Sequence, residues 1–198
     1  MKILFAASDR DLLDCCRKLL SEDFGETVTA FEGTRVMSLI SEEQFDAAII
    51  DFSMPRIECE KLIQAARFRG IPVITTLSEE ADISLLTSEN AADEYLTYPF
   101  AYRELKDILS DLLEKAGSSE IIRFSGLEIE VSKFRFTDGP HVTAGEINTL
   151  KDVLDGRAIR SGHEIFTGSI NLKLARCGAN ARIEYVPKKG YRLVTENE

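Results

Sequence analysis

The sequence predicts an α/β chain whose first part is a five-stranded, parallel, doubly wound sheet and whose second part is a small α+β domain. In the first part, apolar strand-like runs alternate with amphipathic helical runs, which is the pattern of a parallel sheet covered on both faces. In the second part strands come first, helices follow, and a β-ribbon ends the chain. Small, flexible residues at 115–119 separate the two patterns. We therefore expect a domain over 1–116, a linker over 117–120 and a second domain over 121–198.

The elements of the first domain follow from hydrophobic periodicity. Buried parallel strands form short apolar runs. We expect such strands at 2–6, 27–31, 47–51, 72–76 and 94–97. Amphipathic helices place apolar residues three and four positions apart. Runs of this kind predict helices at 11–21, 34–42, 58–69, 81–90 and 102–116.

The elements of the second domain follow from alternation and from turn and cap chemistry. Asp138-Gly139 is suited to closing a hairpin, and Thr143 with Glu146 has the spacing of a capping box at a helix start. Strands are expected at 121–124, 127–131, 133–137, 182–186 and 191–194, and helices at 146–154 and 169–178. This order is typical of a small winged helix.

Charge is unevenly distributed along the chain, although the net charge is -10. Residues 1–117 hold 12 Lys and Arg against 23 Asp and Glu, whereas residues 118–198 hold 12 against 11. Within 167–192 six basic residues face only one acidic residue, Glu184. An acidic half joined to a locally basic half predicts that the second domain faces a polyanion.

Composition narrows the class of protein further. The four cysteines show neither CxxC spacing nor a paired framework, so we expect reduced thiols in a cytoplasmic protein. No apolar run approaches the roughly 20 residues of a membrane span, and the N-terminus does not resemble a signal peptide. We expect no membrane contact and no cofactor.

Asp51 is the most informative single residue. It ends the apolar run Ala47-Ala48-Ile49-Ile50 and would therefore lie at the carboxyl edge of the sheet, where open α/β sheets place their sites. The first strand, by contrast, runs out into Ala7-Ser8-Asp9 without the acidic pair that a magnesium site needs. A carboxylate without metal partners indicates a switch domain whose switch is disabled.

Several segments together carry a resemblance to a known family. These are KILFAASDRDLL, FDAAIIDFSMP, GIPVITTLS and AADEYLTYPF in the first domain, and SINLKLARCG and RIEYVPKKGYRLV in the second. The first 116 residues resemble the receiver domain of bacterial response regulators, as in two-component systems. The rest resembles the winged helix-turn-helix output domain of the OmpR/PhoB type, shortened between Leu154 and Ser169.

The resemblance implies a phosphoryl acceptor at Asp51, in a reaction that needs magnesium and a nearby cation. The magnesium-binding acidic pair of the family falls on Ala7 and Ser8, and the phosphoryl-pairing lysine falls on Tyr98. We therefore expect no metal and no phosphorylation. Instead of accepting a phosphoryl group, the Asp51 carboxylate would hydrogen-bond to loop amides or to a hydroxyl group.

The position of the switch hydroxyl in the family's site is also altered. The switch hydroxyl falls on Leu77, although Thr76 lies one residue away and a shift of alignment would restore it. Asp9 lies beside the missing acidic pair, but its position suits an N-cap of the first helix. The state of the Tyr98-Pro99 peptide bond is left open.

The second domain is expected to bind double-stranded DNA. If Ile170, Leu174 and Cys177 face the core, the other side of the helix over 169–178 projects outward, and amide or basic side chains there can read base edges. The basic residues of the terminal hairpin would contact phosphates or enter the minor groove. The predicted DNA contacts are Ser169, Asn171, Lys173, Arg176, Lys188, Lys189 and Arg192.

The resemblance also implies a homodimer through the fourth and fifth helices of the receiver. Here an apolar seam would form the dimer without phosphorylation. The predicted seam residues are Leu85, Leu86, Ile108 and Leu112, and Asp93 is also expected at the dimer interface.

The sequence therefore predicts a DNA-binding transcriptional regulator that acts as a phosphorylation-independent homodimer and is not an enzyme. Two alternatives stay open. A pseudo-receiver with a degraded winged helix could be a protein-interaction module that binds a protein partner and no DNA. A regulator controlled by phosphorylation is the other, which Ala7, Ser8 and Tyr98 disfavour.

Overall fold

The computed structural model describes residues 1–78, 92–159 and 163–195. They form two compact units, the first up to Glu114 and the second from Lys115 onward. The helix expected over 81–90 lies outside the described residues. In this part of the chain, no helix is long and apolar enough to cross a membrane.

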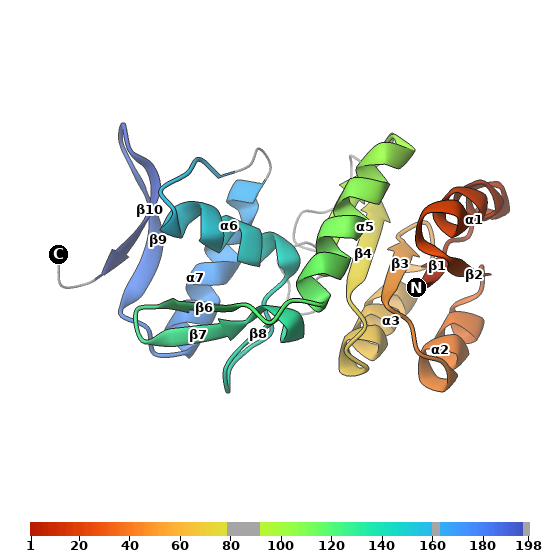
Figure 1. Ribbon diagram of the computed structural model, residues 1–198, viewed down its shortest axis with the longest axis horizontal. Helices are drawn as coiled ribbons and strands as arrows, with labels where there is room; N and C mark the ends of the chain where they lie inside the picture. Colours follow the sequence, from red (N-terminus) through yellow and green to blue (C-terminus); the bar gives the residue numbers. More distant parts are fainter. Residues whose placement is uncertain (79–91, 160–162, 196–198) are drawn as a thin grey trace. The chain divides into compact units, whose positions relative to one another are not determined.

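The first unit is a parallel sheet with helices on both faces, as predicted. The sheet has the strand order β2-β1-β3-β4-β5. Its strands are β1 (Lys2–Ala6), β2 (Glu26–Ala30), β3 (Ala47–Asp51), β4 (Val73–Leu77) and β5 (Glu94–Thr97). The described helices are α1 (Arg10–Phe24), α2 (Gly33–Glu42), α3 (Arg56–Phe68) and α5 (Tyr102–Ala116). Figure 1 shows α2 and α3 on one side of the sheet and α1 and α5 on the other.

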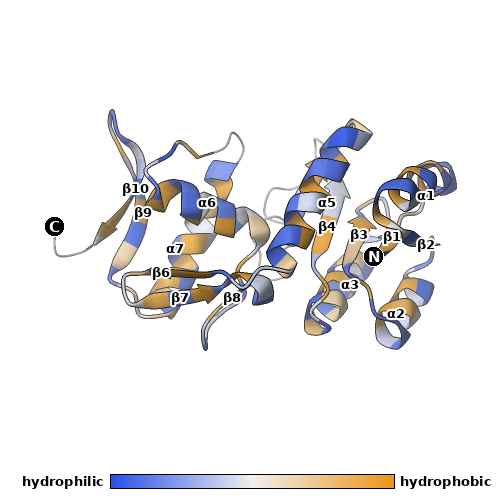
Figure 2. Cartoon of the chain, in the orientation of Figure 1, coloured by the Kyte–Doolittle hydropathy of each residue, from blue (hydrophilic) through white to orange (hydrophobic). Residues whose placement is uncertain are grey.

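Alternation along the strands supplies both cores of this unit. Leu4, Ala6, Ala48 and Ile50 belong to a buried cluster with apolar residues of α2 and α3. Neighbouring strand residues point to the opposite face, because side chains alternate along a strand. Figure 2 shows the central strands as predominantly hydrophobic. This packing buries the end of β3, where Asp51 lies.

The second unit is an α+β domain. Three antiparallel strands come first: β6 (Ile121–Phe124), β7 (Leu127–Glu130) and the short β8 (Arg135–Phe136). The helices α6 (Ala144–Leu154) and α7 (Phe166–Arg176) follow, and the antiparallel hairpin of β9 (Ala181–Val186) and β10 (Gly190–Thr195) ends the described chain. Between α6 and α7 the described residues form only one helical turn, η2 (His163–Ile165).

Local sequence rules account for how α6 begins and how close α7 lies to it. The predicted capping box is present, since Thr143 accepts a hydrogen bond from the backbone N–H of Glu146 and the Glu146 carboxylate accepts one from the backbone N–H of Thr143. Gly145 then allows close packing, because a Cβ atom there would lie 2.5 Å from the ring of Phe166. The last predicted helix was wrong at its start: α7 begins at Phe166, three residues before Ser169.

Candidate functional site

Asp51 lies at the end of β3 with its carboxylate enclosed by donors. The residue is 1% exposed. One carboxylate oxygen accepts a hydrogen bond of 2.7 Å from the backbone N–H of Ser53. The other accepts the hydroxyl of Thr76 and, at 2.6 Å, the phenol of Tyr98. The expected pairing of Asp51 with loop amides or hydroxyl groups is therefore confirmed.

The strand register explains why Thr76 reaches Asp51. The two residues are direct partners across β3 and β4, so their side chains lie on the same face of the sheet. Leu77 points away and is buried at 5% exposure. The hydroxyl that reaches Asp51 is therefore that of Thr76, the neighbour that a shift of alignment would put at the switch position.

Tyr98 is held over the carboxylate by its backbone and its ring. Its N–H donates to the carbonyl of Leu77 at 2.8 Å, its ring centroid lies 4.8 Å from that of Phe100, and the Tyr98-Pro99 bond is cis. Burial raises the pKa of the Tyr98 phenol above its ordinary value, and its hydrogen bond to Asp51 raises the pKa further. Tyr98 is therefore a neutral hydrogen-bond donor, in the position where the resemblance places an ammonium group.

The residues beside the Asp51 carboxylate do not fit a magnesium ion. Ala7 is fully buried and offers no side-chain oxygen. Ser8 instead contacts the loop after β3, with two hydrogen bonds of 3.3 Å to Ser53. Asp9 caps α1, as predicted, by accepting from the N–H groups of Asp11 and Leu12. Across the described ranges, no group of three or more His, Cys, Asp and Glu residues could hold a metal ion.

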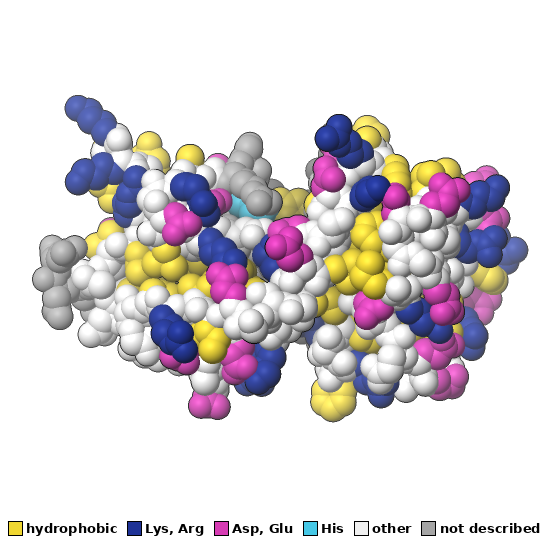
Figure 3. All heavy atoms as spheres, viewed as in Figure 1, with side chains coloured by type: hydrophobic (Ala, Val, Ile, Leu, Met, Phe, Trp, Pro, Cys, Tyr) yellow, Lys and Arg dark blue, Asp and Glu magenta, His cyan; other side chains and the backbone are white. Residues whose placement is uncertain are grey.

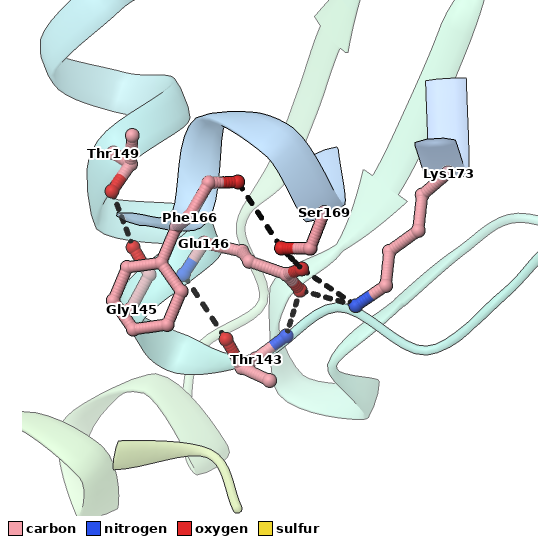
Figure 4. A network of polar contacts seen from close by, with 7 residues as sticks. All are labelled: Thr143, Gly145, Glu146, Thr149, Phe166, Ser169 and Lys173. Atoms are coloured by element: carbon pink, nitrogen blue, oxygen red, sulfur yellow. Dashed lines mark hydrogen bonds and ion pairs between the residues drawn. The ribbon is translucent and has the colours of Figure 1, made fainter. Parts of the chain in front are cut away.

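In the second unit the predicted DNA-binding helix is tied to α6 by a buried ion pair. Figure 4 shows the Glu146 carboxylate between Thr143, Ser169 and Lys173. The Lys173 ammonium donates to both carboxylate oxygens, at 2.7 and 2.6 Å, and the Ser169 hydroxyl donates at 2.6 Å. The side chains of Lys173 and Glu146 are 10% and 2% exposed. The prediction that Ser169 and Lys173 project outward was wrong, because both face α6.

Asn171 is also engaged within the second unit. Its amide nitrogen donates to the carbonyl of Ile183 at 2.9 Å, and its amide oxygen accepts from the N–H of the same residue at 2.7 Å. The amide therefore joins α7 to β9 as another strand would. Asn171, too, is turned away from the position in which it would read a base, contrary to the prediction.

The outward face of α7 is consequently almost free of polar groups. Its exposed residues are Gly168, Leu172, Ala175 and Arg176, and Leu172 is 68% exposed. We call these four residues the exposed stripe of α7. Arg176 alone among the four predicted helix contacts remains on the surface.

The β9–β10 hairpin carries exposed basic side chains, and we call it the wing. Lys188 and Lys189 are exposed at its tip, and Figure 3 shows dark-blue side chains gathered there. Arg192 lies lower on the wing and donates to the carbonyls of Tyr191, at 2.6 Å, and Gly156, at 3.4 Å. Part of its guanidinium therefore ties the wing to the end of α6.

The predicted dimer seam is only partly accessible. Asp93 is 1% exposed and accepts a hydrogen bond from the N–H of Val73 at 2.7 Å, and Leu112 is fully buried. Both are therefore unavailable to a partner, contrary to the prediction. Ile108 is partly exposed. Leu85 and Leu86 lie outside the described residues.

Comparison with known proteins yields relatives but no match to any protein-family model. The response regulator MprA of Mycobacterium tuberculosis is 28% identical over 138 residues, which cover 66% of this chain and 60% of MprA. The transcriptional regulatory protein PrrA of the same species is 26% identical over 171 residues, covering 82% of this chain and 72% of PrrA. The chain thus spans about three fifths of the first relatives that it matches.

Solved structures show the same architecture. The receiver domain of the Francisella response regulator 1452 is 27% identical, with a TM-score of 0.51 over 57% of this chain and 96% of that domain. A point mutant of RitR is 15% identical, and its TM-score of 0.68 covers 98% of this chain and 99% of its own. The first unit therefore has the receiver fold, a small β-rich domain follows it, and the homologues of this chain are response regulators.

Proposed function

We propose that this protein is a DNA-binding transcriptional regulator of the response-regulator type, which acts as a homodimer and without phosphorylation. The observation that carries the proposal is the enclosure of Asp51, whose two carboxylate oxygens accept from Ser53, Thr76 and Tyr98. Asp51 lies in a unit with the receiver fold, and the relatives of this chain include a transcriptional regulatory protein.

Electrostatics argue against phosphotransfer at this site. A phosphoryl group develops charge on its oxygens, which receivers neutralise with a metal ion and a cation. Here the phenol of Tyr98 and the hydroxyl of Thr76 both donate to one oxygen of the Asp51 carboxylate, the group that would act as nucleophile. Both donors are neutral. The positions where the family has its magnesium-binding acidic pair are occupied by Ala7 and Ser8.

We predict that the unmodified protein acquires no phosphoryl group from acetyl phosphate and magnesium. Intact-mass spectrometry measures this directly, with the Asp51→Asn variant as the control. A phosphoryl mass that appears on the parent protein and is absent from Asp51→Asn would contradict phosphorylation independence.

DNA binding is proposed for the second unit because exposed cations gather on its wing. Lys188 and Lys189 lie at the tip of a β-hairpin, an element that can approach a DNA backbone or groove. The basic excess within 167–192 leaves this region positive although the whole chain is acidic. Contacts of this kind depend on salt, because binding releases counterions from the phosphates.

Replacing both tip lysines, as Lys188→Gln/Lys189→Gln, is expected to flatten the salt dependence of DNA binding. Each phosphate contact contributes about 0.9 to the slope of log K against log salt, so losing two lowers the slope by about 1.8. Fluorescence anisotropy with a random-sequence duplex measures the slope. The matched control is Lys133→Gln/Arg135→Gln, which removes the same charge from exposed residues outside the wing. Equal slopes for the two variants would remove the wing from the proposed contact.

The homodimer predicts the form of the DNA site. Two output domains on one dimer would bind half-sites about one helical turn apart, which selection from a random duplex pool can detect. Among the predicted interface residues that the structure describes, Ile108 on α5 is the one that is partly exposed and therefore accessible to a second copy of the chain.

One observation favours a second candidate function, a protein-interaction module. The exposed stripe of α7 is neutral except for Arg176, and a helix face with an exposed leucine also suits a protein partner. A binding constant for DNA that does not change with salt would favour this candidate over the first.

A further inference from the structure

The rotation of α7 about its own axis is determined by contacts on its two inner sides. Ser169 and Lys173 hold it to Glu146 of α6, and Asn171 holds it to the backbone of Ile183 in β9. Figure 4 shows the first of these anchors. Turning the helix by one residue would leave the Glu146 carboxylate buried without its cation, which is strongly unfavourable. The face that α7 presents to a ligand is therefore predetermined.

That face is the exposed stripe of Gly168, Leu172, Ala175 and Arg176. Their spacing of i, i+4, i+7 and i+8 places them along one side of the helix. Leu172 is 68% exposed, and beyond the adjacent residues and backbone of α7 itself no heavy atom lies within 4 Å of the position that a Cβ atom on Gly168 would occupy. The stripe thus has one large apolar side chain, flanked by residues small enough to let the helix backbone approach a surface closely.

The chemistry of the DNA major groove determines what such a stripe can recognise. Most of what a base pair presents there is a hydrogen-bond donor or acceptor, and the exception is the 5-methyl group of thymine. Leu172 and Ala175 have no polar side-chain atoms, so apolar contact with thymine methyl groups is the direct readout open to them. Arg176 places one guanidinium at the C-terminal end of the stripe.

We infer that α7 recognises thymine-containing half-sites by apolar contact of Leu172 and Ala175 with thymine methyl groups. This inference rests on the proposed DNA-binding function and adds the class of base that the helix reads. Charge complementarity favours DNA over a protein as the occupant, because the same unit presents Lys188 and Lys189 and only one acidic residue within 167–192.

Uracil provides the test, because it pairs as thymine does and lacks the methyl group. Random-sequence duplex pools made with thymine or with uracil are incubated with the full-length protein, and the retained DNA is quantified. Retention of the thymine pool is expected to be about fourfold higher for each methyl contact, the factor that corresponds to burying one methyl-sized group. Equal retention of the two pools would overturn the inference and leave DNA binding intact. Retention of neither pool would overturn the proposed function itself.

Two variants assign the effect to the exposed stripe. Leu172→Ala is expected to lower the ratio of thymine to uracil retention by about fourfold, because the contact of Leu172 with one methyl group is lost and that of Ala175 remains. Leu154→Ala is the matched control, since Leu154 is an exposed leucine at the end of α6 and outside the stripe. It is expected to keep the ratio of the parent protein. A ratio that stays at the value of the parent protein in Leu172→Ala would overturn the inference and leave the exposed leucine to a protein partner.

Discussion

Replacing Lys173 by methionine is expected to destabilise the second unit by about 3–5 kcal/mol, the cost of leaving one partner of a buried ion pair alone. Glu146 is 1% exposed, and three of its hydrogen bonds come from Lys173 and Ser169. Methionine keeps an unbranched apolar stem and removes the ammonium group, with its charge and its two hydrogen bonds to Glu146. Urea unfolding, followed through hydrogen exchange of peptides from α6 and α7, measures the loss where it occurs.

Two controls separate a buried pair from a surface lysine. Glu146→Gln/Lys173→Met leaves no unpaired charge, and glutamine keeps one acceptor oxygen for the N–H of Thr143, while its NH2 group can donate to the Ser169 hydroxyl. The double variant should therefore recover much of the loss. Lys189→Met, at the exposed tip of the wing, should leave the unfolding midpoint unchanged. If Lys173→Met unfolds at the urea concentration of the parent and loses only DNA affinity, Lys173 is a DNA contact after all.

The buried role of Lys173 was hidden in the sequence because its partner is distant. Lysine is almost never fully buried without a counter-charge, and Glu146 lies 27 positions away with an obvious local role in the capping box. The basic surroundings of Lys173 pointed to solvent. One signal was present in the sequence. Ser169 and Lys173 immediately precede Ile170 and Leu174, so on a helix they lie beside the apolar side and can be buried with it.

The receiver-like unit was more predictable, because short-range rules decide most of it. Buried parallel strands can be recognised in a sequence as apolar runs. Asp51 ends one of these runs, which predicts its place at the carboxyl edge of the sheet, where open α/β sheets have their sites. The cap at Asp9 follows from its position before the first helix. The hydroxyl at Thr76 required the register of β3 against β4, which no local pattern specifies. Predicting the contact between the Tyr98 phenol and Asp51 required the path of the chain after β5, which the sequence alone does not specify.

Removing the phenol of Tyr98 should destabilise the first unit. We expect Tyr98→Phe to destabilise it by about 1.5–3 kcal/mol, the contribution of a hydrogen bond to a charged group. The reason is that Asp51, at 1% exposure, would keep only Ser53 and Thr76 as donors. Urea unfolding followed by hydrogen exchange of β3 and β4 peptides measures the change. Tyr102→Phe is the control, because its hydrogen bond to Asp23 is exposed and its loss should cost less.

The same phenol predicts how stability changes at alkaline pH. Burial, and then the hydrogen bond to Asp51, raise the pKa of Tyr98 in the folded protein above its unfolded value of about 10. A folded-state pKa that is raised gives a contribution to stability that is complete below pH 10 or so and is lost as pH rises toward the folded pKa. Above about pH 10 the parent should therefore lose stability more steeply than Tyr98→Phe does. Parallel curves would mean that the phenol does not hold the Asp51 carboxylate, and the case for a receiver closed to phosphate would lose its central contact.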